Sequence, residues 1–349
     1  MINKLHYLIK FNFEKKHSYI TNKNSGFTLI ELLVAMILAA LIITPLLGFM
    51  INILDTDRKE QAKVSSEQEI QTALDYIAQD LQQAIYIYDA KGVQKIKNEL
   101  PLSSASDRVP VLVFWKREFV KEAIEIRNST TSRNLNDSFV YSLVAYYLIQ
   151  SNNTNNSNET WSNQFRIARF ELKGGILNSD NPGTESNPNY IKEPQDGFAL
   201  FKLNDPSITG TLEDKMNAWE NSSTPNSNMP ILVDYVDASQ DSVPDHVECD
   251  TVFDLDKYPS DKQTDKEKAL KVPAFENTYY YSLNTNLKKL GNSSFYACVD
   301  VDTVSAKIFL RGNALARINQ KDNSYKENRK SYFPTSSVLV KGRGLIGVE

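Results

Sequence analysis

The chain has 349 residues, of which 41% are hydrophobic and 23% are charged, with a formal net charge of −4 and a mean hydropathy of −0.41. These averages exclude a polytopic membrane protein, a disordered tail and a protein that binds nucleic acid through bulk positive charge. The two cysteines are too few for a disulfide scaffold or a four-ligand zinc site.

The averages conceal one strongly apolar segment, residues 27–53, in which Glu31 is the single ionisable side chain. About 20 apolar residues in an α-helix cross a bilayer, so the segment is long enough to span a membrane. It is too long for a secretory signal peptide and has no small-residue cleavage site after it, which leaves an uncleaved anchor as the alternative. Residues 1–26 contain five lysines and one glutamate. The positive-inside rule therefore predicts a cytoplasmic N-terminus and an extracytoplasmic C-terminal part.

A carboxylate inside an apolar span costs roughly 2.5–3.5 kcal/mol, so Glu31 indicates a function. The residues around it, SGFTLIE at positions 25–31, resemble the processing site of type IV pilins and of the pseudopilins of type II secretion systems. The resemblance implies that a prepilin peptidase cleaves between Gly26 and Phe27 and that Phe27 is then N-methylated. It also implies that Glu31, together with Thr28, acts in assembly. The Glu31 carboxylate would meet the N-terminal amine of a neighbouring subunit, which removes the cost of a bare charge.

The helix is expected to continue beyond the membrane to about residue 90, with Gly92 as its stop. Apolar residues recur every three or four positions on one face, while polar residues such as Asp80 are expected to face away. The apolar positions are Ile70, Leu74, Ile77, Leu81 and Ile85. The pattern and the resemblance together divide the chain into a cytoplasmic leader (1–26), a transmembrane half-helix (27–53), an extracytoplasmic amphipathic half-helix (54–90) and a β-rich globular head (91–349).

From residue 109 onwards the apolar pattern has a period of two and is rich in β-branched and aromatic residues, which indicates strands. We expect strands at residues 109–115, 139–149, 164–172, 231–236, 305–310 and 336–340. Two polar segments, 151–159 and 178–194, are expected to be long exposed loop insertions. One long helix followed by strands predicts an α+β fold, similar to that of type IV pilins, in which the helix packs on an antiparallel β-sheet.

Parts of this region resemble the sheet of large minor pilins and pseudopilins, namely VAYYLIQ, FRIARFELKG and ILVDYV. Two further parts, FYACVD and IFLRGNALARI, resemble the hormogonium polysaccharide secretion pseudopilins of gliding cyanobacteria. The resemblance implies a minor subunit of a pilus or pseudopilus, built by a type II secretion or type IV pilus-like machine, that supports polysaccharide secretion and gliding motility. The implied partners are other pilins, the prepilin peptidase and an inner-membrane assembly platform. The implied location is the inner membrane, crossed once, and then the pilus.

Cys249 and Cys298 both lie in the part predicted to be extracytoplasmic, where disulfides persist. A bridge between them would close a loop of about 50 residues and would contribute about 4 kcal/mol to stability. Two separate free thiols are the alternative.

Charge is unevenly distributed over the C-terminal part. Residues 234–268 are acidic and predict a solvated loop; calcium binding is the alternative, although the EF-hand spacing is absent. Residues 307–349 are basic with interleaved aromatic side chains. Candidate residues for a polyanion there are Arg317, Lys321, Arg329 and Lys330. A site of this kind would make the chain a tip adhesin that binds an acidic polysaccharide or nucleic acid. An ordinary solvated edge without a partner is the alternative.

Enzymatic motifs are missing from the sequence. After cleavage at Gly26, His246 would be the sole histidine, and the chain contains no Walker A, G-x-S-x-G or H-E-x-x-H motif. We therefore expect a structural protein without catalytic residues, metal or cofactor. A membrane-anchored hydrolase with a pair of carboxylates is the alternative, since such residues stand far apart in a sequence.

Overall fold

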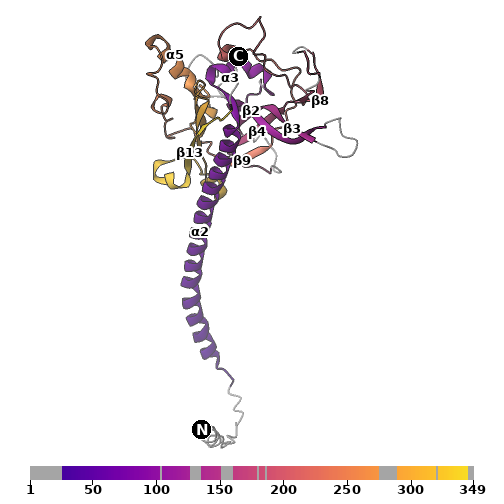
Figure 1. Cartoon of the computed structure of the whole chain (residues 1–349). Coiled ribbons are helices and arrows are strands. Elements are labelled where there is room, and N and C mark those ends of the chain that lie inside the picture. The colour runs from indigo at the N-terminus through magenta and orange to yellow at the C-terminus, as the bar shows by residue number, and fades with distance from the viewer. Residues whose placement is uncertain are drawn as a thin grey trace, which may run out of the picture. The chain divides into compact units, whose positions relative to one another are not determined.

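The computed structural model describes residues 26–102, 104–125, 135–150, 160–178, 181–184, 187–274, 289–319 and 321–344. The chain divides into two compact units, residues 1–56 and residues 57–349 (Figure 1). Helix α2 (Leu29–Gln82) begins in the first unit and ends in the second. Of the expected leader, only Gly26 is among the described residues, and the expected loop 151–159 lies outside them.

In the first unit, α2 continues through Pro45 without interruption, and its side chains up to Thr56 are all exposed. The large apolar side chains from residue 27 to residue 54 range from 48% exposed at Val34 to 87% at Phe27. Among the described helices, α2 alone is long and apolar enough to cross a membrane. So much exposed apolar surface indicates a part of the chain that is covered by lipid or by other proteins.

In the second unit, α2 buries one face against the strands and leaves the opposite face in water. The buried positions recur every three or four residues, as the sequence pattern predicts. They are Ala62, Ser66, Ile70, Ala73, Leu74, Ile77, Ala78, Asp80 and Leu81.

The prediction that the helix continues to residue 90 is wrong, because α2 ends at Gln82 and strand β1 (Ala84–Tyr88) follows it. All five residues of β1, AIYIY, are buried. An amphipathic helix would leave part of this β-branched and aromatic run in water, whereas a strand covered on both faces buries all of it. Gly92 is not a stop either. It lies inside helix α3 (Ala90–Ile96), where its N–H donates to the side chain of Asp89 at 2.7 Å.

The end of α2 is tied to strands from both ends of the head. The Arg343 N–H, just after the last strand, donates to the carbonyl of Gln82 at 3.1 Å. The Arg117 N–H, in the second strand, donates to the carbonyl of Gln83 at 3.1 Å. These bonds satisfy carbonyl groups that the C-terminus of a helix otherwise leaves without partners.

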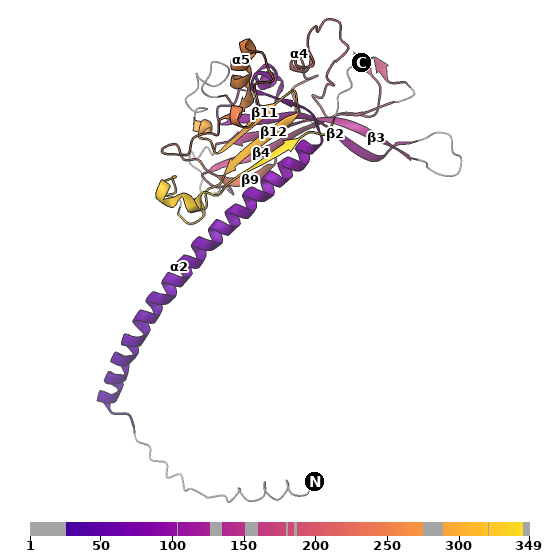
Figure 2. The same cartoon turned by 60° about the vertical axis from the view of Figure 1, so that its left-hand side comes forward.

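The main strands form two antiparallel sheets. The first has the order β1, β2 (Arg108–Glu125), β3 (Leu135–Ile149), β4 (Phe165–Lys173) and β9 (Ile231–Val236). The second has the order β10 (Lys271–Val272), β11 (Phe295–Asp300), β12 (Ser305–Arg311) and β13 (Thr335–Lys341). Figure 1 and Figure 2 show β4, β9 and β13 near the last part of α2, and one hydrophobic core joins both sheets to the buried face of the helix.

The predicted α+β class, with a helix packed on antiparallel strands, is confirmed, and each of the six predicted strands overlaps an observed one. The expected single sheet is instead two sheets, connected by an isolated bridge between Val236 and Gly312. Gly312 also lies against the helix, because a Cβ atom there would come within 2.9 Å of Ile70 Cγ1. Strands β1, β10 and β11 are not among the predicted ones, since they are short or buried on both faces and show no period of two.

The remaining described elements are short. They are η1 (Lys97–Glu99), β5 (Ile176–Leu177), β6 (Gly183–Thr184), β7 (Asn187–Pro188), β8 (Tyr190–Lys192), α4 (Leu212–Asn217), η2 (Cys249–Thr251), α5 (Ser260–Leu270), η3 (Lys289–Gly291), η4 (Leu315–Arg317) and η5 (Glu327–Tyr332). The segment predicted as loop 178–194 is therefore partly organised into the antiparallel pairs β5–β8 and β6–β7.

A disulfide joins Cys249 in η2 to Cys298 in the middle of β11, the pairing that the sequence favours. Both residues are buried with Leu270, Tyr296 and Phe309 in a small cluster separate from the main core. Side chains alternate along β11, so this cluster covers the face of the second sheet that is turned away from the main core. The bridge thus links the middle of the acidic segment to the second sheet.

Replacing both cysteines by alanine should lower the free energy of unfolding of the full chain by about 4 kcal/mol, because the unfolded chain regains the freedom of a long loop. Urea unfolding of the detergent-solubilised protein, followed by tryptophan fluorescence, measures the change. Reductant should lower the stability of the wild type to that of the double variant and leave the variant unaffected. Equal stability of the two proteins without reductant would show that the bridge does not stabilise the head.

Candidate functional site

Helix α2 begins with a reciprocal pair of hydrogen-bonding residues, Thr28 and Glu31. The Glu31 N–H donates to Thr28 Oγ1 at 3.3 Å. In return, the Thr28 N–H and hydroxyl donate to Glu31 Oε2 at 3.2 and 3.0 Å. This is a capping box, in which Thr28 is the N-cap and Glu31 the third residue of the helix. The Thr-x-x-Glu spacing is a sequence signal of a capping box. The resemblance to pilins predicts a role of Thr28 and Glu31 in assembly but does not predict these hydrogen bonds.

The peptide bond between Gly26 and Phe27, where cleavage is predicted, lies before the first turn of the helix and is accessible. Phe27 is 87% exposed, and a Cβ atom placed on Gly26 would meet no atom within 4 Å. A side chain at position 26 would therefore not disturb this chain. If glycine is required there, the requirement comes from the enzyme that cleaves the bond.

The Glu31 carboxylate lies in the first turn of α2, where the helix dipole favours a negative charge. Its Oε2 atom accepts both hydrogen bonds from Thr28, and the side chain is exposed. A cation of another molecule can therefore approach it. In hydrocarbon such a partner would offset the cost of the bare carboxylate.

A second group of polar residues, missed by the sequence analysis, lies where α2 meets the first sheet. Asp80 of α2 accepts from Arg169 Nε at 2.7 Å and from the Tyr146 hydroxyl at 2.7 Å, and its other oxygen lies 3.2 Å from Lys116 Nζ. Glu171 completes the cluster at 2.8 Å from Arg169 and 3.0 Å from Lys116. We call these five residues the Asp80 cluster. It contains two acidic and two basic groups, so its charges balance.

The prediction that Asp80 faces away from the head is wrong, since its side chain is buried at the helix end. Burial acts to raise the pKa of Asp80. The hydrogen bond from Arg169 and the charge of Lys116 outweigh that effect and hold the pKa below its usual value of 3.8. The signal that could have found the cluster is weak, because Lys116, Arg169 and Glu171 stand at ordinary alternating positions of their strands.

Three of the four candidate basic residues of the tail have acidic partners within the head. Arg317 points to α2, where its Nε donates to Ser66 Oγ at 2.9 Å and its guanidinium pairs with Glu69 and lies over the Tyr235 ring. Arg329 pairs with Asp322 at 2.8 Å.

Lys330 pairs with Glu327 at 2.9 Å, and Lys321 is exposed in the same segment. Arg317 thus holds the tail to the helix, and acidic neighbours partly neutralise Arg329 and Lys330. Binding of a polyanion by these four residues stays a prediction.

Two aspartates of the acidic segment also form hydrogen bonds within the head. Asp237 is fully buried and accepts from Arg311 Nε at 2.8 Å, and Asp234 accepts from the hydroxyl and N–H of Ser162. His246 lies against the Tyr296 ring. In the part of the chain that the structure describes, no group of three or more His, Cys, Asp or Glu side chains is placed to hold a metal ion.

Comparison with known proteins places a family model, described as the prokaryotic N-terminal methylation motif, on residues 21–47. The match includes the predicted cleavage site, Thr28, Glu31 and most of the apolar segment. No curated protein and no solved structure matches the chain. The motif implies processing by a prepilin peptidase, pilin partners, and anchoring of the chain in a membrane by its apolar helix. It is a motif of structural proteins and not of enzymes.

Replacing Asp80 by asparagine should lower the free energy of unfolding by about 3–5 kcal/mol at neutral pH, because Lys116 and Arg169 lose the charge that compensates them. Urea unfolding with Asp75→Asn, an exposed position of the same helix, as the control measures the loss. The lowered pKa of Asp80 stabilises the fold fully at pH values above the usual value of 3.8, and this contribution is lost as the pH falls through the lowered pKa, so the two proteins should converge there. A difference that does not change with pH would argue against a charge effect.

Proposed function

We propose that this chain, which carries a prepilin-type motif of type IV pilin-like proteins, is a minor pilin or pseudopilin subunit that is processed in the membrane and assembles through α2. The observation that carries the proposal is the methylation motif at residues 21–47, which lies at the start of a helix with exposed apolar side chains. In the precursor, residues 27–53 span the inner membrane, residues 1–26 are cytoplasmic and the head is extracytoplasmic.

Processing would take place at the exposed residues that precede the first turn of α2. The peptidase cleaves the accessible bond between Gly26 and Phe27, and the new amine of Phe27 is methylated. Cleavage removes the lysine-rich leader and leaves one ammonium group directly before the capping box. The mature subunit therefore begins with a positive charge, followed four residues later by the negative charge of Glu31.

Assembly uses these two charges. In lipid, the ammonium group of one subunit and the Glu31 carboxylate of its neighbour reduce each other's cost of burial. The pairing also sets the position of one helix along the next, because only one register brings the two groups together. Thr28 contributes indirectly by holding Glu31 Oε2 at the helix start.

We further propose that the machine exports polysaccharide and supports gliding motility. Support comes from the resemblance of residues 295–300 and 308–318 to hormogonium polysaccharide secretion pseudopilins. A large head with long insertions would crowd the shaft of a helical filament, which favours a minor subunit near the tip. The proposed partners are other pilins and an inner-membrane assembly platform.

Replacing Glu31 by alanine should leave cleavage intact and reduce incorporation into filaments at least tenfold, because the neighbour's ammonium loses its partner. Loss of the leader on a gel measures cleavage, and the amount of subunit in sheared filaments measures incorporation. Thr28→Ser keeps the capping hydroxyl and is the matched control, with both steps expected to be normal. Normal incorporation of the Glu31→Ala subunit would rule out the assembly role.

The proposal about export is tested separately by deleting the gene and scoring surface filaments and exported polysaccharide in the same cells. Reduced export with filaments retained is the expected result, because a minor subunit of a secretion machine is not needed to build other filaments. Restoration by the wild type, but not by a Gly26→Val precursor that resists cleavage, is the control. Unchanged export would remove polysaccharide secretion from the proposal.

A further inference from the structure

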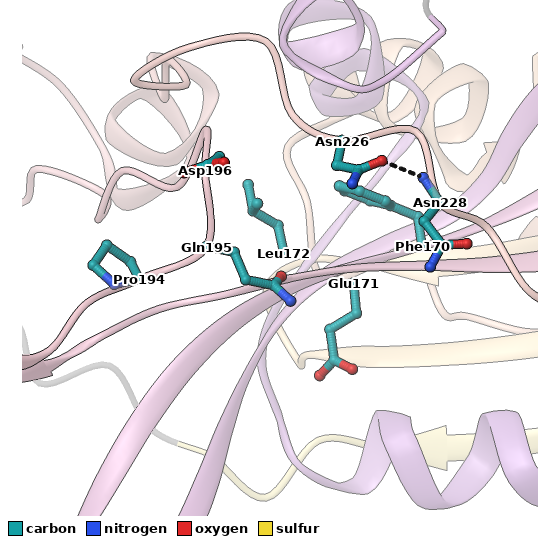
Figure 3. A pocket seen from close by; sticks show the side chains of 8 residues that line it. All are labelled: Phe170, Glu171, Leu172, Pro194, Gln195, Asp196, Asn226 and Asn228. Carbon is teal, nitrogen blue, oxygen red and sulfur yellow. Dashed lines mark hydrogen bonds between the residues drawn. The ribbon is translucent and has the colours of Figure 1, made fainter.

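A pocket of about 370 Å³ lies beside β4 in the second unit and includes no residue of the processing motif or of α2 (Figure 3). Three segments line it. They are Phe170, Glu171 and Leu172 of β4, Pro194, Gln195 and Asp196 of the loop after β8, and Asn226 and Asn228 of the loop before β9. Its volume lies within the range of sites for small ligands.

The floor of the pocket is a short piece of strand edge that β9 does not cover. Strand β9 pairs with β4 only from Phe165 to Ala168, and the next N–H on this edge, that of Arg169, donates to the carbonyl of Pro230 at 3.0 Å. Further along, Lys173 exchanges two hydrogen bonds with Gln195: its N–H donates to Gln195 Oε1 at 2.8 Å, and its carbonyl accepts from the Gln195 N–H at 3.0 Å.

Between these two points lies Glu171. Successive peptide groups of a strand point to opposite sides, so its N–H and C=O face the same edge as those of Arg169 and Lys173. The pocket therefore offers one main-chain donor and one main-chain acceptor side by side. Because both flanking positions are already occupied, a whole additional strand does not fit, whereas a single amide group does.

The Glu171 side chain contributes nothing to this surface. Figure 3 shows it pointing away from the other labelled side chains, and its carboxylate is held by Arg169 and Lys116 in the Asp80 cluster. Asp196 is thus the one charged side chain at the pocket, which disfavours an anionic ligand.

The walls combine neutral hydrogen-bonding groups with a small apolar surface. Gln195, Asn226 and Asn228 are exposed amides, and the Asn226 side chain is held in place by a bond from the Asn228 N–H at 3.1 Å. Such amides, with the Asp196 carboxylate, suit the hydroxyl groups of a sugar. Phe170 and Leu172, each 2% exposed, add the apolar part.

We propose that this pocket binds a neutral glycan that carries an acetamido group. The acetamido group has one N–H and one C=O, like a peptide group, and pairs with the C=O and N–H of Glu171 as one rung of a β-ladder. Its methyl group lies toward the apolar residues of β4. Ring hydroxyl groups bind Asn228 and Asp196 at the rim. This proposal does not rest on the assembly role of α2.

The test is isothermal titration of the full chain, in a zwitterionic detergent that contains no sugar, with triacetylchitotriose and with cellotriose. The two trimers share their backbone and differ in the acetamido group. Triacetylchitotriose should bind saturably and at least tenfold more tightly than cellotriose. Asn228→Ala and Asp196→Ala should each weaken binding by about tenfold, because each removes a hydrogen bond to the sugar.

The control variant is Asn187→Ala, an exposed asparagine of β7 that does not line the pocket, and it should bind like the wild type. All three substitutions are at exposed positions, and urea unfolding of each variant checks that the fold is unchanged. Equal affinity for the two trimers, unchanged binding by both pocket variants, or no saturable binding of triacetylchitotriose at millimolar concentration would each overturn the proposal.

Discussion

The balanced group of charges around Asp80 determines how the end of helix α2 is held in the second unit. Asp80 contacts Lys116 of β2, Tyr146 of β3 and Arg169 of β4, so one helical residue engages three neighbouring strands. Two acidic and two basic groups at this depth are tolerated only because each finds a partner. A slip of the helix by one turn would leave several of them without one, so the charges define the register of the helix on the sheet.

From that fixed end, α2 passes through two environments. Its residues up to Thr56 are exposed although most are apolar, whereas from Ala62 onwards one face is buried in the core of the head. The same helix therefore serves two purposes that need different surfaces. An apolar surface all round suits lipid and neighbouring helices, and a single apolar stripe suits packing on a sheet. The processing motif lies at the free end of the first part.

Much of this arrangement could be predicted from the sequence where the signal is local. The apolar segment around Glu31, the face that contains Ile70 and Ile77, and the strand at residues 231–236 all follow from composition and period. With only two cysteines, a disulfide could form in one way alone. The predicted end of the helix was wrong at Ile85. The first four apolar positions of the predicted face lie in α2, but Ile85, which continues the same spacing, belongs to β1. A run buried on both faces carries no periodicity from which a strand can be recognised.

The sequence by itself determined the features that depend on neighbouring residues: the cleavage motif, the membrane-length helix, the Thr-x-x-Glu spacing at its start and six of the main strands. Only the tertiary structure decided which polar residues are buried together and where a strand edge stays open. The partners of Asp80 lie 36 to 89 positions away in the chain. The open edge at Glu171 exists because β9 ends its pairing at Ala168. Both are set by how distant segments pack, and no local pattern of residues encodes that packing.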